Sequence, residues 1–325
     1  MDRRAFLAGA AAIGFACSGD RSAVAQAFPS KVIRIVVPTG AGGPPDIIER
    51  IIANALSDDE GWKVIVEDKP GGAQTVGTLE VLKQPSDGYT LLAATPPVTA
   101  IRGLAPEAKF NVEKDLVPVI QIGTGYNILV VNPELPVHSV AELVEYLKRD
   151  TGQHTFSSGG FGTPAHLLGE LFLLETGLHA THVPYNGATA RAIADLVSGI
   201  NTYQFIALVP VVQLIQSGKL RALAIMGGKR AAVLPDVPTI AEAGYPKLQA
   251  EDWHGLLVKS GTPAEDIARL NETINTVLAT EKVRDALAKV GFDVGGGTPD
   301  KFGALMHAET LRWTKVIKDA GIKID

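Results

Sequence analysis

The sequence predicts an α/β protein made of two lobes, each built on a largely parallel β-sheet. Short apolar runs alternate with longer segments whose apolar residues recur at helical spacing, a pattern typical of parallel strands covered by helices. The alternation breaks near residue 125, where two apolar runs follow each other with no helix between them. A chain of 325 residues also exceeds what one hydrophobic core usually serves. These three observations predict two lobes joined by crossing strands.

The first lobe begins with a strand that stops at Pro38, followed by a glycine-rich loop and a helix. The same order then recurs, and each strand ends at a turn signal. In chain order, we expect a strand over 31–37, a helix over 46–56, a strand over 63–67, a helix over 74–83 and a strand over 89–94 that leads into a turn at 95–97.

The second lobe begins where the apolar runs 119–123 and 127–131 follow each other. A new series of alternating elements comes next: helix 140–149, strand 155–158, helix 164–175, strand 181–184, helix 190–198 and strand 203–207. A strand over 220–226 should return the chain to the first lobe, which 240–244, a strand over 253–258 and amphipathic stretches over 265–290 and 299–320 complete. The predicted lobes are 28–125 with 227–325, and 126–226.

Residues 1–27 have the features of an export signal. Arg3 and Arg4 open a charged segment, small and apolar residues follow, and a small-x-small cleavage pattern ends at Ala27. The paired arginines favour a twin-arginine signal over a Sec signal. A lipid anchor at Cys17 is disfavoured because no leucine-type residue stands three positions upstream. We therefore expect cleavage near Ala27 and a periplasmic protein.

Composition excludes several classes of partner. The net charge is −5 and no run of Lys and Arg occurs, which argues against a nucleic-acid partner. No later segment offers the roughly 18 uninterrupted apolar residues of a membrane span. The only cysteine lies in the expected signal, and the histidines lack a spacing such as His-Glu-x-x-His, so neither a metal nor a cofactor is expected.

Two glycine-rich loops, each between an expected strand and an expected helix, are the main candidates for ligand binding. Backbone N–H groups in such loops, together with the helix dipole, favour an anion such as a carboxylate. The first loop is no dinucleotide fingerprint, because Pro45 stands where the last glycine would fall, and no P-loop motif follows. In both loops a purely structural turn is the alternative, with Ser157 and Thr163 as simple helix caps. The first loop spans 38–46 and the second 157–163.

Two residues outside these loops are further candidates. Thr95 and Tyr185 follow expected strands directly, and open α/β sheets bind ligands at the carboxyl ends of their strands. Trp253 is a better candidate for the core than for a ligand platform. Ser157 and His166 would suit a hydrolase, but no Gly-x-Ser-x-Gly motif surrounds the serine and no acidic partner is identifiable. Nucleophilic catalysis is therefore disfavoured, and no catalytic residue is assigned.

Short motifs along the whole mature chain resemble the periplasmic substrate-binding proteins of tripartite tricarboxylate transporters, the Bug family. Two of them are Glu67-Asp68-Lys69-Pro70-Gly71-Gly72 and Pro85-Ser86-Asp87-Gly88-Tyr89-Thr90-Leu91-Leu92. The others lie in order at 29–34, 36–38, 42–46, 158–166, 183–185, 218–223, 234–239, 242–244 and 261–263. The resemblance implies a type II periplasmic binding protein fold that closes on its ligand, a small carboxylate as ligand and a membrane permease as partner of a monomeric protein.

The resemblance also implies which residues bind the ligand. Carried over by position, they are Thr39, Gly40, Ala41, Gly43, Asp46, Thr95, Ser158, Gly159, Phe161, Thr163, His166 and Tyr185. The chain departs from the family after Gly199, where an acidic residue and a Phe-Asp pair give way to Asn201, Thr202 and Phe205-Ile206, and Pro44-Pro45 precedes Asp46. These departures favour a less polar ligand wall at Phe205. A periplasmic hydrolase or isomerase and a ligand-sensing partner of a receptor stay open as alternatives.

Overall fold

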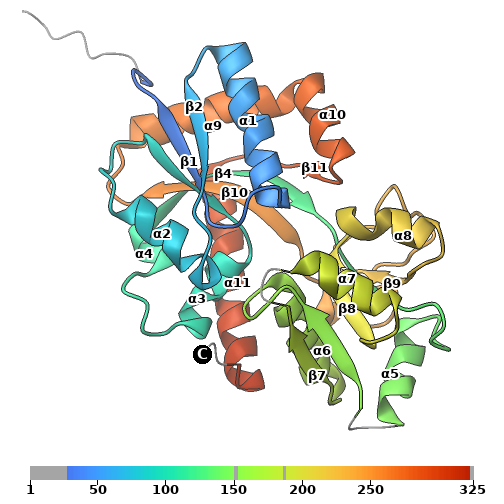
Figure 1. The fold of residues 1–325 in the computed structure, drawn as a ribbon. Coiled ribbons are helices and arrows are strands. Elements are labelled where there is room, and N and C mark those ends of the chain that lie inside the picture. The colour runs from blue at the N-terminus through green and yellow to red at the C-terminus, as the bar shows by residue number, and fades with distance from the viewer. Residues whose placement is uncertain (1–27, 150–152, 186–187, 323–325) are drawn as a thin grey trace, which may run out of the picture. The chain divides into compact units, whose positions relative to one another are not determined.

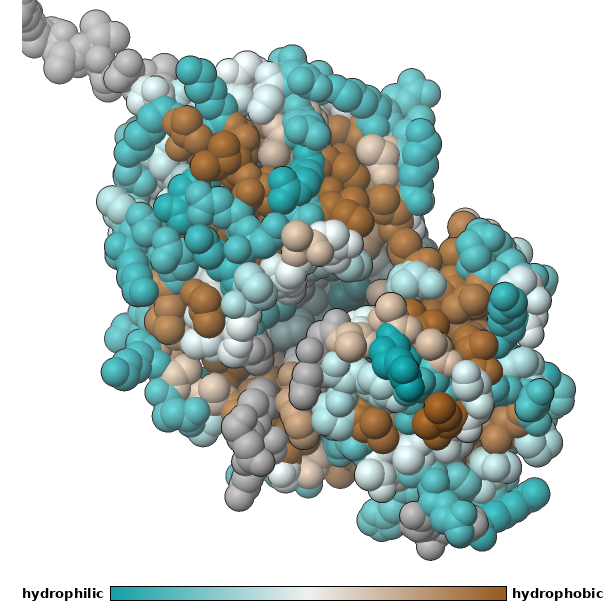
Figure 2. All heavy atoms as spheres, in the orientation of Figure 1, coloured by the Kyte–Doolittle hydropathy of each residue, from teal (hydrophilic) through white to brown (hydrophobic). Residues whose placement is uncertain are grey.

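The computed structural model describes residues 28–149, 153–185 and 188–322, and the part from Lys31 onwards forms one unit with two mixed β-sheets (Figure 1). The expected export signal, its cleavage site and Cys17 lie outside the described residues. Within the described ranges no helix has both the length and the apolar character that a bilayer crossing requires. Hydrophilic residues cover much of the face seen in Figure 2, with hydrophobic patches between them.

The first sheet has the strand order β11-β4-β10-β3-β1-β2. Its strands β2, β1 and β3 are parallel, whereas β10 runs antiparallel to both β3 and β4, and β11 runs antiparallel to β4. The prediction of a largely parallel sheet therefore holds only for its first three strands, because β10 enters from the opposite end. The strands are β1 Ile33–Val37, β2 Val64–Asp68, β3 Thr90–Ala94, β4 Leu116–Gly125, β10 Asp252–Lys259 and β11 Asp293–Val294.

The helices around this sheet are more numerous than predicted. The proline pair at 96–97 suggested a turn, yet it begins a helix, because the first turn of a helix does not need the N–H that proline lacks. The amphipathic stretch 265–290 is two helices, since the Thr280 hydroxyl accepts a hydrogen bond from Val283 N and caps the second. The helices are α1 Pro44–Glu60, the short η1 Gly72–Gln74, α2 Thr75–Leu82, α3 Pro97–Leu104, α4 Val112–Asp115, α9 Ala264–Ala279, α10 Glu281–Lys289 and α11 Pro299–Ala320.

The second sheet has the strand order β7-β6-β8-β5-β9. Strands β7, β6 and β8 are parallel, and β5 is antiparallel to β8 and β9. The elements are β5 Asn127–Val131, α5 Val140–Lys148, β6 Thr155–Ser158, α6 Pro164–Thr176, β7 Thr181–Pro184, α7 Thr189–Val197, β8 Tyr203–Ala207, η2 Val209–Val211, α8 Val212–Gln216, β9 Arg221–Ile225 and η3 Pro246–Leu248. Only Tyr126 separates β4 in the first sheet from β5 in the second, which confirms the predicted crossing.

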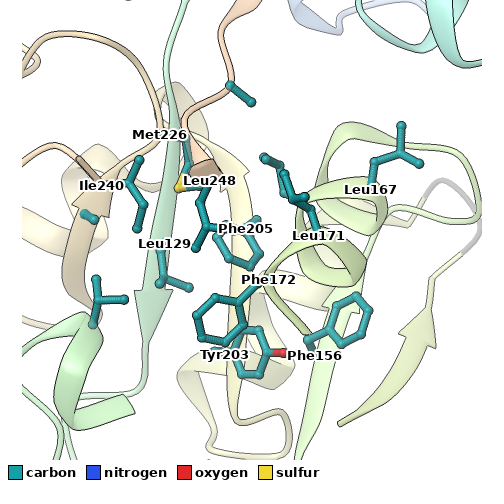
Figure 3. Packing of buried hydrophobic residues seen from close by; sticks show 14 of the residues in the cluster. Leu129, Phe156, Leu167, Leu171, Phe172, Tyr203, Phe205, Met226, Ile240 and Leu248 are labelled. Atoms are coloured by element: carbon teal, nitrogen blue, oxygen red, sulfur yellow. The ribbon is translucent and has the colours of Figure 1, made fainter. Parts of the chain in front are cut away.

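A large core cluster packs on the α6 side of the second sheet, where Phe172, Tyr203 and Phe205 lie close together (Figure 3), and it also includes residues of α3 and α11. Ile240 and Leu248 belong to this cluster, and Ile240 N donates a hydrogen bond to Ile225 O at 2.7 Å. The chain after β9 therefore packs with the second sheet as far as residue 250, although the predicted lobe boundary falls at 226. The lobe boundaries themselves stay a prediction.

Candidate functional site

Three loops meet at the carboxyl edge of the parallel strands β1, β2 and β3 (Figure 1). Lys69, after β2, donates its N–H to Val37 O at the end of β1 at 2.7 Å. Gly77 of α2 lies so close to Pro38 that a β-carbon added to the glycine would come within 2.7 Å of Pro38 Cβ. These contacts hold the loops after β1 and β2 together, and Thr95 follows β3 at the same edge.

Asp46 braces the glycine-rich loop after β1. Its Oδ2 accepts a hydrogen bond from Gly42 N at 2.9 Å, and its Oδ1 lies 2.6 Å from Arg50 Nε. Arg50 also lies 3.3 Å from Asp68, so this cation is shared by two carboxylates. Asp46 is buried, and its contacts hold the loop in place.

The loop after β1 exposes its backbone, but the first turn of α1 that follows it offers few N–H donors. Gly40 and Ala41 are exposed, and Gly43 begins α1 without a side chain to cap it. Pro44 and Pro45 occupy the first two helical positions and carry no N–H. The Gly42 and Gly43 N–H groups already donate to Asp46 Oδ2 and Gly40 O, so an anion at this loop must be held by the N–H groups of Gly40 and Ala41 and by neighbouring hydroxyls, more than by the first turn of α1.

Gln74 lies beside Thr95 and was missed by the sequence reading. Its side chain is buried, and its Nε2 donates to Thr95 Oγ1 at 2.5 Å. The Gln74 Oε1 and Thr39 Oγ1 atoms are buried without a hydrogen-bond partner in the described part of the chain. The signal was present, because Gly71-Gly72 form a third glycine-rich turn between a strand and a helix.

The loop after β6 is held by neutral groups. Thr163 Oγ1 donates to Gly160 O at 2.7 Å and accepts from His166 N at 3.4 Å, so Thr163 caps α6, as the structural alternative proposed. Ser157 does not cap the helix, because its Oγ is buried without a hydrogen-bond partner among the described residues. Ser158 Oγ accepts from Gly160 N at 3.0 Å and lies 2.6 Å from His182 Nε2. Gly159 lies against Thr189 at the beginning of α7, which brings the loop to a second helix start.

Aromatic rings cover this loop. His166 and His182 stack at 4.2 Å between ring centroids, and Phe161, which is 46% exposed, meets their rings edge-on at 5.3 and 5.1 Å. Burial lowers the pKa of His166 to about 3, with His182 as a second cause, and burial lowers the pKa of His182 to about 4. Both imidazoles are therefore neutral at pH 7, and the surface beside Phe161 is aromatic and uncharged.

Tyr185 follows β7 at the same edge, but its hydroxyl is engaged within the protein. The hydroxyl donates to Asp195 Oδ2 at 2.7 Å and accepts from Asn201 Nδ2 at 2.9 Å. Burial and the bond to Asp195 raise the Tyr185 pKa. Arg191 pairs with Asp195 at 2.8 Å, so the cation beside this loop is also neutralised by a carboxylate.

Phe205 does not form the less polar ligand wall that the departures from the family suggested. Its side chain is 0% exposed, and it packs with Leu129, Phe172 and Tyr203 in the core (Figure 3). Side chains alternate along a strand, and Phe205 shares the α6 side of β8 with Tyr203. We therefore leave it out of the site. Trp253, also 0% exposed, lies in the core of the first sheet, as expected.

A serine and a histidine do lie in contact, but they are Ser158 and His182, and Ser157 is not bonded to His166 in the described structure. Ser158 is fully buried, and the His182 Nδ1 atom finds no carboxylate among the described residues. A pKa of about 4 also makes His182 a weak base. The arrangement gives no support to nucleophilic catalysis. No group of three or more His, Cys, Asp or Glu in the described ranges could hold a metal ion.

Comparisons with known proteins show a family likeness over most of the chain. The family model described as "Tripartite tricarboxylate transporter family receptor" matches residues 48–322. Protein BugT of Bordetella pertussis is 35% identical over 302 residues, which cover 92% of each chain. An R. palustris protein solved with adipate is 33% identical at a TM-score of 0.81, covering 91% of this chain and 100% of its own. MatC from Rhodopseudomonas palustris with bound malate is 28% identical at a TM-score of 0.78, covering 89% and 100%.

Proposed function

Because the chain belongs to the family of tripartite tricarboxylate transporter receptors, we propose that it captures a small carboxylate-bearing molecule outside the cytoplasm and passes it to a membrane permease. One observation carries this proposal. Each sheet contains three parallel strands, β2-β1-β3 in the first and β7-β6-β8 in the second, and the candidate loops lie at the carboxyl ends of these strands. Adipate and malate, the molecules named with two similar structures, are both carboxylates.

The proposed site binds its anion with neutral donors. The cations beside the loops, Arg50 and Arg191, are each within ion-pair distance of carboxylates of this chain. The Ser158, Thr163 and Tyr185 hydroxyls donate within the protein, so backbone N–H groups and the hydroxyls of Thr39 and Thr95 remain as donors. Such groups bind an anion well when helix dipoles stand behind them. The contributing residues are Thr39, Gly40, Ala41, Gly43 and Thr95 from the first lobe, and Ser158, Gly159, Phe161, Thr163, His166 and Tyr185 from the second, with Asp46 as a brace.

The two chain connections between the sheets would allow the lobes to close on a ligand. The proposed lobes are 28–125 with the chain from about 251 onwards, and 126–226 with the packed segment up to residue 250. The connections run through Tyr126 and through the chain between β9 and β10. Asp293 of β11 contacts both the Tyr126 hydroxyl and Lys229, so it links the two connections. A rotation about these connections would bring the two loop sets onto one ligand.

The compartment and the partner complete the proposal. Residues 1–27 direct export and are removed near Ala27, and the mature monomer acts in the periplasm. The closed form alone then presents the surface that the permease reads.

A binding screen tests this function. The purified protein is heated with adipate, malate, succinate, citrate, aspartate, terephthalate or nicotinate, because a ligand that binds the native state raises the melting temperature by mass action. We expect a concentration-dependent rise with at least one acid, which mass spectrometry then recovers unchanged. No rise with any acid would overturn the carboxylate proposal, and chemical conversion of the acid would favour a periplasmic enzyme.

A further inference from the structure

Gln74 has a backbone conformation that suits glycine. Among the residues that the structure describes, it alone combines a side chain with a positive φ, at +77°. Glycine adopts this region freely, whereas a β-carbon crowds the neighbouring carbonyl oxygen. Strain of this kind persists where the surroundings hold the residue in place, and it gathers at binding sites. We therefore expect the Gln74 side chain to make a contact that glycine could not make.

The surroundings of Gln74 hold it at both ends. Thr78 Oγ1 donates to the Gln74 backbone oxygen at 2.9 Å, and Gln74 Nε2 donates to Thr95 Oγ1 at 2.5 Å. Gln74 is 6% exposed, Thr95 is 5% exposed, and the Gln74 Oε1 is buried without a partner in the described chain. The amide thus reaches from the loop after β2 to the end of β3.

The bond from Gln74 decides what the Thr95 hydroxyl can do. A hydroxyl carries one proton and accepts through its lone pairs. Because Thr95 Oγ1 already accepts from the amide, its own proton is free for an outside acceptor. With the amide turned over, Thr95 would donate to Gln74, and the amide N–H would become the free donor. In either arrangement the pair presents a hydrogen-bond donor at the carboxyl edge of the first sheet, beside the loop that contains Thr39.

We propose that Gln74 is a positioning residue of the ligand site, which fixes the Thr95 hydroxyl as a hydrogen-bond donor to the ligand's carboxylate. This inference rests on the proposed function and names how the first lobe holds the acid. Gln74 acts through Thr95, and its strained backbone is the cost of bringing the amide within reach.

The test separates binding from stability. Calorimetric titration with adipate and with malate gives the dissociation constant for the wild type and for Gln74→Gly, Gln74→Glu, Thr95→Val and Gln74→Gly with Thr95→Val. We expect Thr95→Val to weaken binding about tenfold or more, the effect of losing a donor to a charged group. Gln74→Gly should weaken binding roughly three- to tenfold without lowering the melting temperature of the free protein, since glycine removes the strain.

Two further variants and one control variant sharpen the test. Gln74→Glu can only accept, so it would take the proton of Thr95 and add a negative charge, and binding should weaken at least as much as in Gln74→Gly. The double variant should bind no worse than Thr95→Val alone, because both changes remove the same donor. Thr310→Val removes an equally buried hydroxyl that bonds Met306 O within α11, and it should leave the dissociation constant unchanged.

The outcomes distinguish this inference from the function it rests on. If the wild type binds an acid and both Gln74 variants bind it equally well, the positioning role is overturned while the proposed function stands. A lower melting temperature of Gln74→Gly with unchanged affinity would mean that Gln74 serves the fold alone. A wild type that binds neither adipate, malate nor another acid of the screen would overturn the proposed function and the inference together.

Discussion

Helices α1 and α6, which follow the two candidate loops, begin with the same kind of hydrogen bond, but side chains of different charge accept it. At the third helical position, Asp46 in α1 and His166 in α6 each accept a hydrogen bond from the glycine N–H four residues earlier, at 2.9 and 3.1 Å. One turn later, the acidic side chain faces a basic one and the imidazole faces an acidic one. Arg50 Nε lies 2.6 Å from Asp46, and Glu170 Oε1 lies 3.7 Å from His166 Nε2.

The difference lies in charge. Asp46 is paired with a cation that reaches into solvent, since the Arg50 side chain is 49% exposed. Burial instead lowers the pKa of His166 to about 3, so its imidazole is neutral near pH 7, and burial also raises the pKa of Glu170. The loop geometry therefore requires a hydrogen-bond acceptor at this position and tolerates either charge state. The two lobes should respond differently to pH and to substitution.

The largest expected effect concerns Glu49, which lies on the buried side of α1 and is 1% exposed. Burial raises its pKa to about 8, so the folded protein keeps a proton that the unfolded chain loses above about pH 4.5. Stability is then lost as pH rises between these values, by at most about 5 kcal/mol. We expect Glu49→Gln to gain stability relative to the wild type at about pH 8.5 and much less at about pH 4.5, by urea unfolding. An equal gain at both pH values would contradict this assignment.

The brace at Asp46 should have the next largest effect. Asp46→Ala removes the acceptor of Gly42 N and leaves Arg50 with only Asp68, and we expect a loss of about 2–3 kcal/mol in the free energy of unfolding. Asp46→Asn keeps an acceptor at the same place and should lose about 1 kcal/mol less. If the alanine and asparagine variants are equally unstable in urea, charge matters more than the acceptor, and the comparison with His166 fails.

The smallest effect belongs to His166 and has the opposite sign to that of Glu49. The unfolded chain takes up a proton below about pH 6.5, whereas folded His166 does not until about pH 3, so stability falls as pH decreases. The expected loss is about 2 kcal/mol at about pH 5. His166→Asn keeps an acceptor for Gly162 N and removes the titration. Urea unfolding at about pH 7.5 and pH 5 should show a smaller loss for this variant than for the wild type, and parallel losses would exclude His166 as the cause.

Much of the fold could be read from the sequence, because its signals are local. Strands 155–158, 181–184 and 203–207 are observed at their predicted bounds, and α11 begins at Pro299 after the Thr298 cap and ends before Gly321. The antiparallel placement of β10 could not be read, since its partners are more than a hundred residues away.

The candidate site was readable as loops but not as side-chain contacts. The family motif led to residues 39–46 and 158–166, yet the partner of Ser158 is His182, 24 residues later, and the partner of Gln74 is Thr95, 21 residues later. Such pairs depend on which strands are neighbours in a sheet. Phe205 was misplaced because the side of a strand that a residue faces changes with every position, and an apolar run buried on both sides does not reveal it.

The strand order has a consequence for how the chain folds. All five strands of the second sheet lie between residues 127 and 225, so this sheet can close from one continuous stretch of chain. The first sheet cannot, because β10 inserts between β3 and β4 and arrives only with residues 252–259. Contacts between distant segments form slowly, since a long loop must first be closed. We therefore expect the second sheet to form first and to serve as a folding nucleus. In the first sheet, β3 lacks a partner on one edge until β10, near the end of the chain, pairs with it.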